Sequence, residues 1–391
     1  MIRLGVVGYG LRSTLMVKTF RKADPDVRVV AVVDPDEAGV RARLEEIDKS
    51  DVVFYKNLKD MIMRANLDGL FIATRCNLHT PYAIEASKYN VPIFLEKPVA
   101  TSMNQVLSLE KAFLKFKSQV VVGFPLRITP ICTLTKKLIE EGAVGTPQHI
   151  LGVNYVPYGT VYFDEMYRNY EVTQGLFLQK ATHDFDYMSF LMGSPIVRVC
   201  AMKTCGRVFG GKKKANMKCS QCREANTCLE SPKNRIRNCS SSQLKDHWCT
   251  FGRDCGSPQT GMNEDSSSAL LEFASGVHGV YTQVFFTRRD ALVRGSTISG
   301  YHGTVSFDWY KNEIIRVRHH APFSDTIKAG GEAEHFGGDT ELAHDFVNIM
   351  RGKGKSRTPI STGLASVYSC LAAKESAEKG KFIKVRQVGQ F

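Results

Sequence analysis

The chain has 391 residues, of which 43% are hydrophobic, and a formal net charge of +13. This length predicts two domains of ordinary size. No apolar stretch approaches the ~20 residues that a membrane-spanning helix needs, so a helical membrane protein is excluded.

The positive charge is unevenly distributed. The segment 203–218 contains many basic residues and no acidic one, whereas elsewhere basic and acidic residues are interspersed. This pattern is typical of a solvated surface, or of attraction for anionic cofactors and substrates. We therefore do not expect a nucleic-acid partner.

The first predicted elements are a buried strand and a glycine-rich loop. Residues 2–7 form a nearly continuous apolar run, as in a strand that is covered on both faces. The loop and the start of the next helix supply the candidate cofactor ligands Gly8, Tyr9, Gly10, Leu11 and Arg12. Gly8 can make a tight turn, and Gly10 lets the backbone approach a pyrophosphate at the helix N-terminus. Ser13 replaces the usual third glycine and is still small enough for close packing.

The second strand, residues 27–33, ends in Asp34. A carboxylate at this position accepts hydrogen bonds from the adenosine ribose hydroxyls and repels a 2′-phosphate, which favours NAD over NADP. Arg12 leaves NADP open, because a guanidinium near the ribose accommodates the extra phosphate.

Two further strands of the first half end in polar residues. The run 69–73 leads to Thr74, Asn77 and His79, which are expected to line the cofactor crevice, and a helix is predicted over 81–89. The run 91–95 leads to Glu96, Lys97 and Pro98. A lysine at the carboxyl end of such a strand lies where open α/β sheets bind ligands, and Glu96 can pair with or orient its ammonium group.

The alternation of strands and helices predicts a doubly wound parallel sheet in a first domain, residues 1–124. A helix over 103–116 and a strand over 120–124 complete it. The rest, 125–391, reads as a second α+β domain with a large, mostly antiparallel open sheet. Its predicted strands are 149–155, 269–273, 277–285, 297–306 and 382–385, and its predicted helices are 130–141, 342–350 and 363–378. We expect the C-terminal helix to return toward the first domain.

A second candidate catalytic group lies on a predicted helix that continues to Leu191. His183 shares one face with Lys180 and Asp186, each about one turn away. Histidine titrates near neutral pH and can take a proton from a carbinol. Lys97 and Lys180 can stabilise the developing alkoxide. The alternative is a structural histidine without a catalytic role.

Together these residues resemble a known family. The matching positions are Gly8-Tyr9-Gly10, Asp34, Asn77, His79, Glu96-Lys97-Pro98, Gly123-Phe124, Arg127, His183, Asp186 and Gly337-Gly338-Asp339. They are similar to the glucose-fructose oxidoreductase, inositol dehydrogenase and rhizopine-catabolism family of NAD(P)-dependent oxidoreductases, over residues 1 to about 385. The resemblance implies cofactor binding by the first domain, with Arg127 among the ligands. It also implies a homo-dimer or homo-tetramer formed through the open sheet.

One departure from this family concerns the position four residues before the histidine. Many members carry an aspartate there, and this chain has Gln179. An amide neither accepts a proton nor stabilises an imidazolium by charge, so the acid/base pair is expected to be Lys97 and His183. The substrate is expected to contact Lys97, Gln179, Lys180, His183 and Asp186.

A cysteine-rich insertion, about 200–258, interrupts the second domain. Cys219 and Cys222 form a C-x2-C knuckle, with Cys228 and Cys239 beyond it. These four thiols are candidate ligands of a structural zinc ion, and iron–sulfur ligation uses similar spacings. The alternative is a disulfide-stapled or simply cysteine-rich loop. The absence of a recognisable signal peptide predicts a cytoplasmic protein, which favours metal over disulfides.

Two segments of the second domain suit a substrate mouth. Tyrosines and one phenylalanine gather between 155 and 170, where they stack on a sugar ring or pack within the sheet. His335 and Asp339 bring a histidine and a carboxylate to the site, or Asp339 caps the following helix.

The resulting hypothesis is an oxidoreductase that transfers hydride between NAD(P) and a hydroxyl carbon of a sugar or cyclic polyol. A redox-assisted glycoside eliminase and a non-catalytic dinucleotide-binding regulator are the alternatives.

Overall fold

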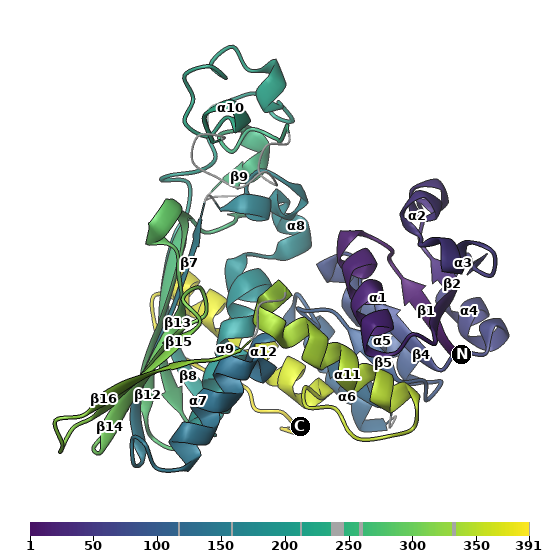
Figure 1. Ribbon diagram of the computed structural model, residues 1–391. Coiled ribbons are helices and arrows are strands. Elements are labelled where there is room, and N and C mark those ends of the chain that lie inside the picture. Colours follow the sequence, from purple (N-terminus) through teal and green to yellow (C-terminus); the bar gives the residue numbers. More distant parts are fainter. Residues whose placement is uncertain are drawn as a thin grey trace.

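The computed structural model describes residues 1–115, 118–157, 159–211, 213–235, 246–257, 261–330 and 334–390. Two sheets dominate the molecule, each with helices packed against it (Figure 1). The N-terminal half contributes one sheet, and most of the remainder contributes the other.

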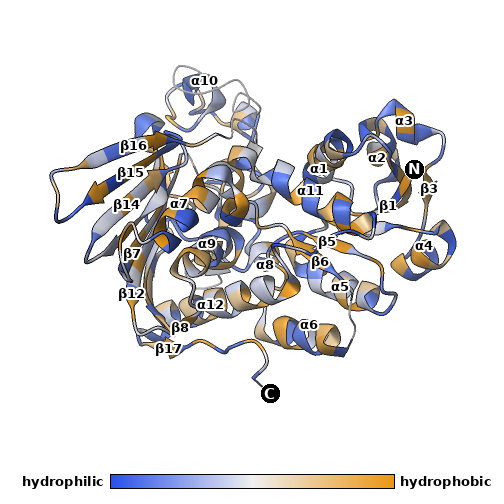
Figure 2. Cartoon of the chain, turned by 60° about the horizontal axis from the view of Figure 1, so that its bottom comes forward, coloured by the Kyte–Doolittle hydropathy of each residue, from blue (hydrophilic) through white to orange (hydrophobic). Residues whose placement is uncertain are grey.

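The first sheet is parallel, as predicted, and has the strand order β3-β2-β1-β4-β5-β6. Its strands are β1 (Ile2–Val7), β2 (Val27–Val33), β3 (Val53–Phe54), β4 (Gly69–Ile72), β5 (Ile93–Leu95) and β6 (Val120–Val122). The apolar character of the sheet around β5 and β6 is visible in Figure 2. This order reverses between β1 and β4, and ligands bind outside the carboxyl ends of the strands at such a reversal. The edge strand β3 escaped sequence analysis because two residues carry no periodicity.

Helices cover both faces of this sheet. They are α1 (Leu11–Ala23), α2 (Glu37–Arg43), α3 (Glu46–Lys49), α4 (Leu58–Ala65), α5 (His79–Ser87) and α6 (Met103–Lys115). A helix from near the other end of the chain, α11 (Gly338–Met350), packs against α1. Its Phe346 ring lies 5.3 Å from Phe20 and 5.5 Å from Phe94, centroid to centroid. These aromatic contacts, tilted with Phe20 and edge-on with Phe94, fasten α11 to the first domain.

The second sheet is mostly antiparallel, also as predicted, with the order β16-β15-β14-β13-β7-β12-β11-β8-β17 in the described part of the chain. Only β7 and β12 run parallel to each other among these described strands. The central strands are β7 (Pro147–Pro157), β8 (Ile196–Thr204), β11 (Ser266–Phe273), β12 (His278–Thr287) and β13 (Val293–Gly300). The outer strands are β14 (Gly303–Asp308), β15 (Glu313–Arg318), β16 (Ser324–Lys328) and β17 (Ile383–Lys384).

The prediction of one strand over 297–306 was wrong. The chain turns at Tyr301 and His302, so that β13 and β14 form a hairpin. The alternation of side chains resumes after the turn, and the sequence pattern alone therefore looked continuous.

One face of the second sheet is covered by three helices of the described chain, namely α7 (Pro130–Glu140), α9 (Thr182–Met192) and α12 (Ile360–Lys379). On the other face Leu151, Val280 and Leu270 lie side by side across β7, β12 and β11. Leu270 is 49% exposed and Leu151 is 37% exposed, so this face carries accessible apolar surface.

The cysteine-rich insertion begins later than predicted. Strand β8 continues to Thr204, which places Cys200 in the sheet. The insertion connects β8 to β11 and includes α10 (Pro232–Arg235), β9 (Gly256–Ser257) and β10 (Gly261–Met262). It stands at the top of the molecule in Figure 1, away from the parallel sheet. None of the helices in the described ranges combines the length and apolar character that a membrane crossing requires.

Candidate active site

The glycine-rich loop between β1 and α1 has the geometry of a dinucleotide cradle. Gly8 has φ +81°, and a Cβ there would lie 2.9 Å from the Thr74 backbone. A Cβ on Gly10 would meet nothing within 4 Å, so this side of the loop is open to a ligand. The Ser13 hydroxyl donates to the Gly8 carbonyl at 2.5 Å. Serine thus adds a hydrogen bond where the usual pattern has only a small residue.

Asp34 is fixed at the end of β2 by its own loop. One carboxylate oxygen accepts from the Tyr9 amide at 2.7 Å and the other from the Asp36 amide at 2.8 Å. Carboxylate oxygens retain further lone pairs, which suit ribose hydroxyls.

Arg12 has a different role from the predicted one. Its guanidinium donates to Glu96 at 2.7 Å and to both carboxylate oxygens of Asp339 at 2.7 and 2.8 Å. Arg12 therefore ties α1 to β5 and α11. Because its guanidinium is engaged there and not with a 2′-phosphate, Arg12 no longer supports the choice of NADP.

Glu96 likewise pairs with Arg12 and not with the Lys97 ammonium as expected. Although burial acts to raise it, hydrogen bonds from Arg12 and His335 hold the pKa of Asp339 well below its usual range. The charges of Arg12, Glu96 and Asp339 thus form one connected network, in which the guanidinium lies between two carboxylates.

The polar residues after β4 divide into two kinds. His79 is buried, with its ring nitrogens 2.9 Å from the Pro98 carbonyl and 3.1 Å from the Thr74 carbonyl. It braces two loops, so its ring is committed to the backbone and not to the crevice. Asn77 instead has a buried side-chain oxygen without a partner, which fits a cofactor group. Leu11, at the start of α1, is 76% exposed beside this crevice.

Lys97 reaches from the end of β5 to the second domain. Its ammonium donates to the Gln179 carbonyl at 2.8 Å. Gln179 lies in a π-helical turn, Phe177–Ala181, that precedes α9. The Gln179 amide oxygen accepts from the Cys76 thiol at 3.6 Å. Gln179 therefore binds the Lys97 ammonium through its backbone carbonyl. The residue type at position 179 does not reveal such a contact. Burial lowers the pKa of Lys97 to about 8.

His183 lies in the first turn of α9, facing the same region. Its Nδ1 is buried and has no hydrogen-bond partner, consistent with the missing aspartate. Its ring lies 5.8 Å from Phe124 and 6.3 Å from His335, centroid to centroid. Burial, aided by the charges of Lys97 and Arg294, holds the pKa of His183 well below its usual range. The ring is therefore neutral at pH 7 and able to accept a proton.

Lys180 belongs to the same cluster. Its ammonium lies 5.8 Å from the centroid of the Tyr162 ring. Burial, together with the charges of Arg294 and Lys97, lowers the pKa of Lys180 well below its ordinary value. Lys97, Lys180 and His183 thus lie close enough for each lysine to depress the pKa of the histidine.

Asp186 and Arg127, predicted to contact substrate and cofactor respectively, contact each other. Arg127 Nε lies 3.2 Å from an Asp186 carboxylate oxygen. Arg127 also lies over the Phe190 ring, 4.9 Å from its centroid. Burial raises the pKa of Asp186 to about 7, against the opposing charge of Arg127. This pair braces the helix that carries His183.

Asp184 is the most connected group of the site, and it was not predicted from the sequence. Its fully buried carboxylate accepts from Tyr281 at 2.8 Å, from Asn154 at 2.9 Å and from Arg294 at 2.9 Å. The partners come from three different strands. The signals in the sequence were that Asp184 directly follows His183 and that the partner side chains alternate along their strands. Arg294 places a permanent positive charge behind Lys97 and Lys180.

His335 and Asp339 form a second pair beside His183. His335 Nδ1 lies 2.7 Å from an Asp339 carboxylate oxygen. The Asp339 carboxylate therefore pairs with Arg12 and His335, and it does not act as a helix cap. The Asp–His pairing that is absent at residue 179 is present here, on a different element.

The aromatic stretch supplies both packing and site residues. Tyr162, Phe163 and Phe285 pack in a small core with Phe209 from the insertion. Tyr162 also lies beside Lys180, as described above. Both readings of this stretch therefore apply in part, and Tyr158 lies outside the described residues.

The predicted zinc ligands are placed only in part. Cys239 lies outside the described residues. Within the described ranges, no three His, Cys, Asp or Glu side chains are arranged to hold a single metal ion. The ten described cysteines are all free, which removes the disulfide alternative for them.

A parallel sheet with a dinucleotide cradle at its reversal, faced by a lysine and a histidine, is the arrangement of a dinucleotide-dependent oxidoreductase. The chain belongs to the Gfo/Idh/MocA oxidoreductase family. Residues 2–124 match its NAD-binding Rossmann-fold domain, and residues 133–306 match its C-terminal domain.

Curated relatives include inositol 2-dehydrogenase 1 of Saccharopolyspora erythraea, 28% identical over 204 residues, which are 52% of this chain and 58% of that protein. Myo-inositol 2-dehydrogenase of Thermotoga maritima is 26% identical over 51% of this chain and 58% of its own length. The chain thus spans a little over half of these relatives. Among solved structures, levoglucosan dehydrogenase in complex with NADH and levoglucosan superposes with a TM-score of 0.74 at 18% identity, covering 99% of this chain and 100% of that one.

Proposed function

We propose that this protein is an NAD-dependent dehydrogenase that oxidises a hydroxyl carbon of a sugar or cyclic polyol. The observation that carries this proposal is the meeting of Lys97 and His183 at the carboxyl end of the parallel sheet. A neutral histidine with an unpartnered, buried nitrogen and a lysine beside it are the two groups that alcohol oxidation needs.

Bound NAD+ supplies the hydride acceptor. The residues of the chain hold the substrate oxygen and move the proton. His183 takes the hydroxyl proton, and the Lys97 ammonium stabilises the alkoxide that forms. Lys180 and Arg294 add positive potential from behind. The His335–Asp339 pair, with the His335 side chain 40% exposed, leads the proton from His183 toward solvent.

The substrate class is supported by the comparisons and by the site. The curated relatives are named for inositol, and the solved neighbour binds levoglucosan, so cyclic polyhydroxyl compounds are the first to test. Tyr162 offers an aromatic wall beside Lys180, which suits the C–H face of such a ring.

Replacing Lys97 tests this function. Purified protein is incubated with NAD+ and a panel of inositols, sugars and glycosides, and NADH formation is followed. Lys97→Met is expected to lower kcat by about 10²–10³, because it removes a charge that acts on the alkoxide. Lys111→Met, on the exposed face of α6, is the matched control and should not change kcat.

The pH profile separates the role of Lys97 from a structural one. Because its pKa is lowered to about 8, the ammonium is lost as the pH rises through 8, and kcat should fall there. Arginine stays charged at all these pH values. The kcat of Lys97→Arg is therefore expected to be lower than that of the wild type but not to fall as the pH rises through 8. Consumption of a glycoside without net NADH would contradict the dehydrogenase in favour of an eliminase. NAD binding without any turnover would favour a regulator.

We further propose that two copies of the chain associate through the open face of the second sheet. Leu151, Val280 and Leu270 form an apolar row there, and apolar rows on a sheet face favour burial against a partner. Leu270→Glu is expected to convert the oligomer to a monomer in analytical ultracentrifugation. Met63→Glu, on exposed α4, should leave the mass unchanged, and a monomeric wild type would disprove the interface.

A further inference from the structure

Four cysteine thiols of the insertion surround one cavity of about 180 Å³. They are Cys219, Cys222, Cys228 and Cys249. The side chains of Lys213, Glu224 and Phe251 complete much of its wall. Cys219 and Cys249 are buried, and the other two are half-buried. The fourth thiol is thus Cys249, which sequence spacing had not singled out.

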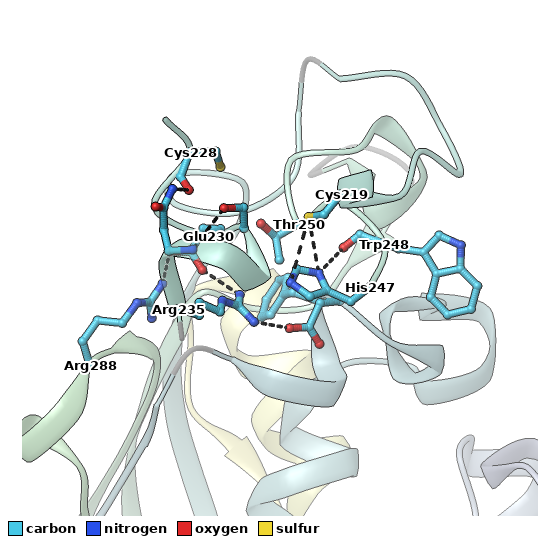
Figure 3. A network of polar contacts seen from close by, with 12 residues as sticks. Cys219, Cys228, Glu230, Arg235, His247, Trp248, Thr250 and Arg288 are labelled. Carbon is cyan, nitrogen blue, oxygen red and sulfur yellow. Dashed lines mark hydrogen bonds and ion pairs between the residues drawn. The ribbon is translucent and has the colours of Figure 1, made fainter. Parts of the chain in front are cut away.

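The local backbone brings these cysteines together. Cys219 and Cys222 lie on one tight turn, in which the Cys222 amide donates to the Cys219 carbonyl at 3.1 Å. A bridge between Lys218 and Trp248 aligns the second segment beside the first. The Cys249 amide then donates to the Met217 carbonyl at 2.8 Å. Figure 3 shows the Cys219 sulfur over the His247 ring, with Cys228 across from it.

The cavity volume of about 180 Å³ exceeds what a single ion occupies. Zinc–thiolate bonds of about 2.3 Å in a tetrahedron place the four sulfurs about 3.8 Å apart. No three ligand-type side chains in the described residues are gathered in that way. A single water-sized sphere needs about 10–15 Å³, so the cavity has room for a group of several atoms.

The chemistry of the lining indicates what fills this space. Four cysteines lining one cavity are a donor set for a metal-containing group, because the thiolate is the form in which cysteine binds metals. Four cysteine ligands around a multi-atom group are the coordination of a cubane iron–sulfur cluster.

We propose that Cys219, Cys222, Cys228 and Cys249 bind a [4Fe–4S] cluster. The cluster holds the insertion in its folded form. Lys213 and Glu224 form an ion pair in the cavity wall, so this pair adds no net charge beside the cluster.

The insertion is in turn connected to the segment that carries the site tyrosines. Arg168 donates to the Cys249 carbonyl at 3.1 Å. Arg235 pairs with Asp164 at 2.7 Å and with Glu230 at 2.7 Å, and Figure 3 shows Arg288 reaching the same glutamate. Asp164 and Arg168 flank Tyr167, which contacts Tyr162 with centroids 6.2 Å apart. The cluster therefore acts as a structural anchor for one wall of the active site.

Metal analysis of the full chain tests the proposal. Protein is purified without oxygen and, if iron-poor, is incubated with ferrous iron and sulfide. We expect about four iron atoms and about four acid-labile sulfides per chain, with the broad visible absorption of such a cluster. About one zinc per chain without sulfide, or no metal at all, would overturn it.

Variants identify the ligands. Cys222→Ser and Cys249→Ser should each lose iron and sulfide and lower the melting temperature. Cys200→Ser, in β8, is the matched control and should retain both. Cys239→Ser should also retain iron and sulfide. If Cys239→Ser loses iron while Cys249→Ser keeps the cluster, the assignment of Cys249 as the fourth ligand is refuted. None of these readouts depends on dehydrogenase activity, so the two proposals fail separately.

Discussion

His183→Ala is expected to lower kcat by about 10²–10⁴, the contribution typical of a positioned general base. The buried Nδ1 of this histidine has no partner in the described structure, and its pKa is held well below the usual range. The ring is therefore neutral at pH 7, which is the state that a general base requires. Steady-state turnover with the best substrate of the panel measures the loss, and NADH titration shows whether cofactor binding persists.

His335→Ala provides the matched comparison. His335 lies beside His183 with ring centroids 6.3 Å apart, but its side chain is partly exposed and water can replace it. Its kcat should therefore fall less than that of His183→Ala. Equal losses in both variants would mean that the histidines act as one unit, and an unchanged His183→Ala would remove this residue from the mechanism.

The largest expected effect on stability comes from Asp184→Ala. Removing one partner of a buried ion pair costs about 3–5 kcal/mol, because the remaining charge is left without compensation. Arg294 is that remaining charge, and Tyr281 and Asn154 lose their acceptor as well. Urea unfolding monitored by circular dichroism measures the change in the free energy of unfolding.

Two further variants show that burial causes this effect. Glu272→Ala breaks the Arg198–Glu272 ion pair at the surface and should cost about 0–1 kcal/mol. The double variant Asp184→Ala/Arg294→Met removes both buried charges and should recover part of the lost stability. A single Asp184→Ala variant as stable as Glu272→Ala would show that Arg294 finds another partner or water.

The contrast between Lys97 and Arg12 shows where sequence reasoning reached its limit. Lys97 was placed at the end of β5 because a short apolar run precedes it, and local pattern is sufficient for that. Arg12 was assigned to the ribose because it follows the glycines, yet its partners Glu96 and Asp339 are 84 and 327 residues away. Ion pairs over such separations depend on how the helices pack, which no local pattern encodes.

Gln179 and His335 also show that local patterns do not reveal tertiary contacts. Gln179 in place of aspartate put a simple Asp–His relay at this position in doubt, and the buried Nδ1 of His183 has no hydrogen-bond partner in the described structure. It did not indicate that the Gln179 backbone carbonyl holds Lys97, because a backbone contact is independent of residue type. Nor did it reveal the His335–Asp339 pair, which a loop brings to His183 from the far end of the chain.

By itself, the sequence determined the parallel and antiparallel sheets, the glycine cradle with Asp34, and the cysteine knuckle, since each follows from short-range periodicity or spacing. Only the tertiary structure decided which charges meet: Arg12 with Asp339, Arg127 with Asp186, and Asp184 with Arg294. It also decided that Cys249 lines the same cavity as Cys219, Cys222 and Cys228. The physical reason is that burial makes an unpaired charge costly, so partners are selected by the packing of distant elements and not by neighbours in the chain.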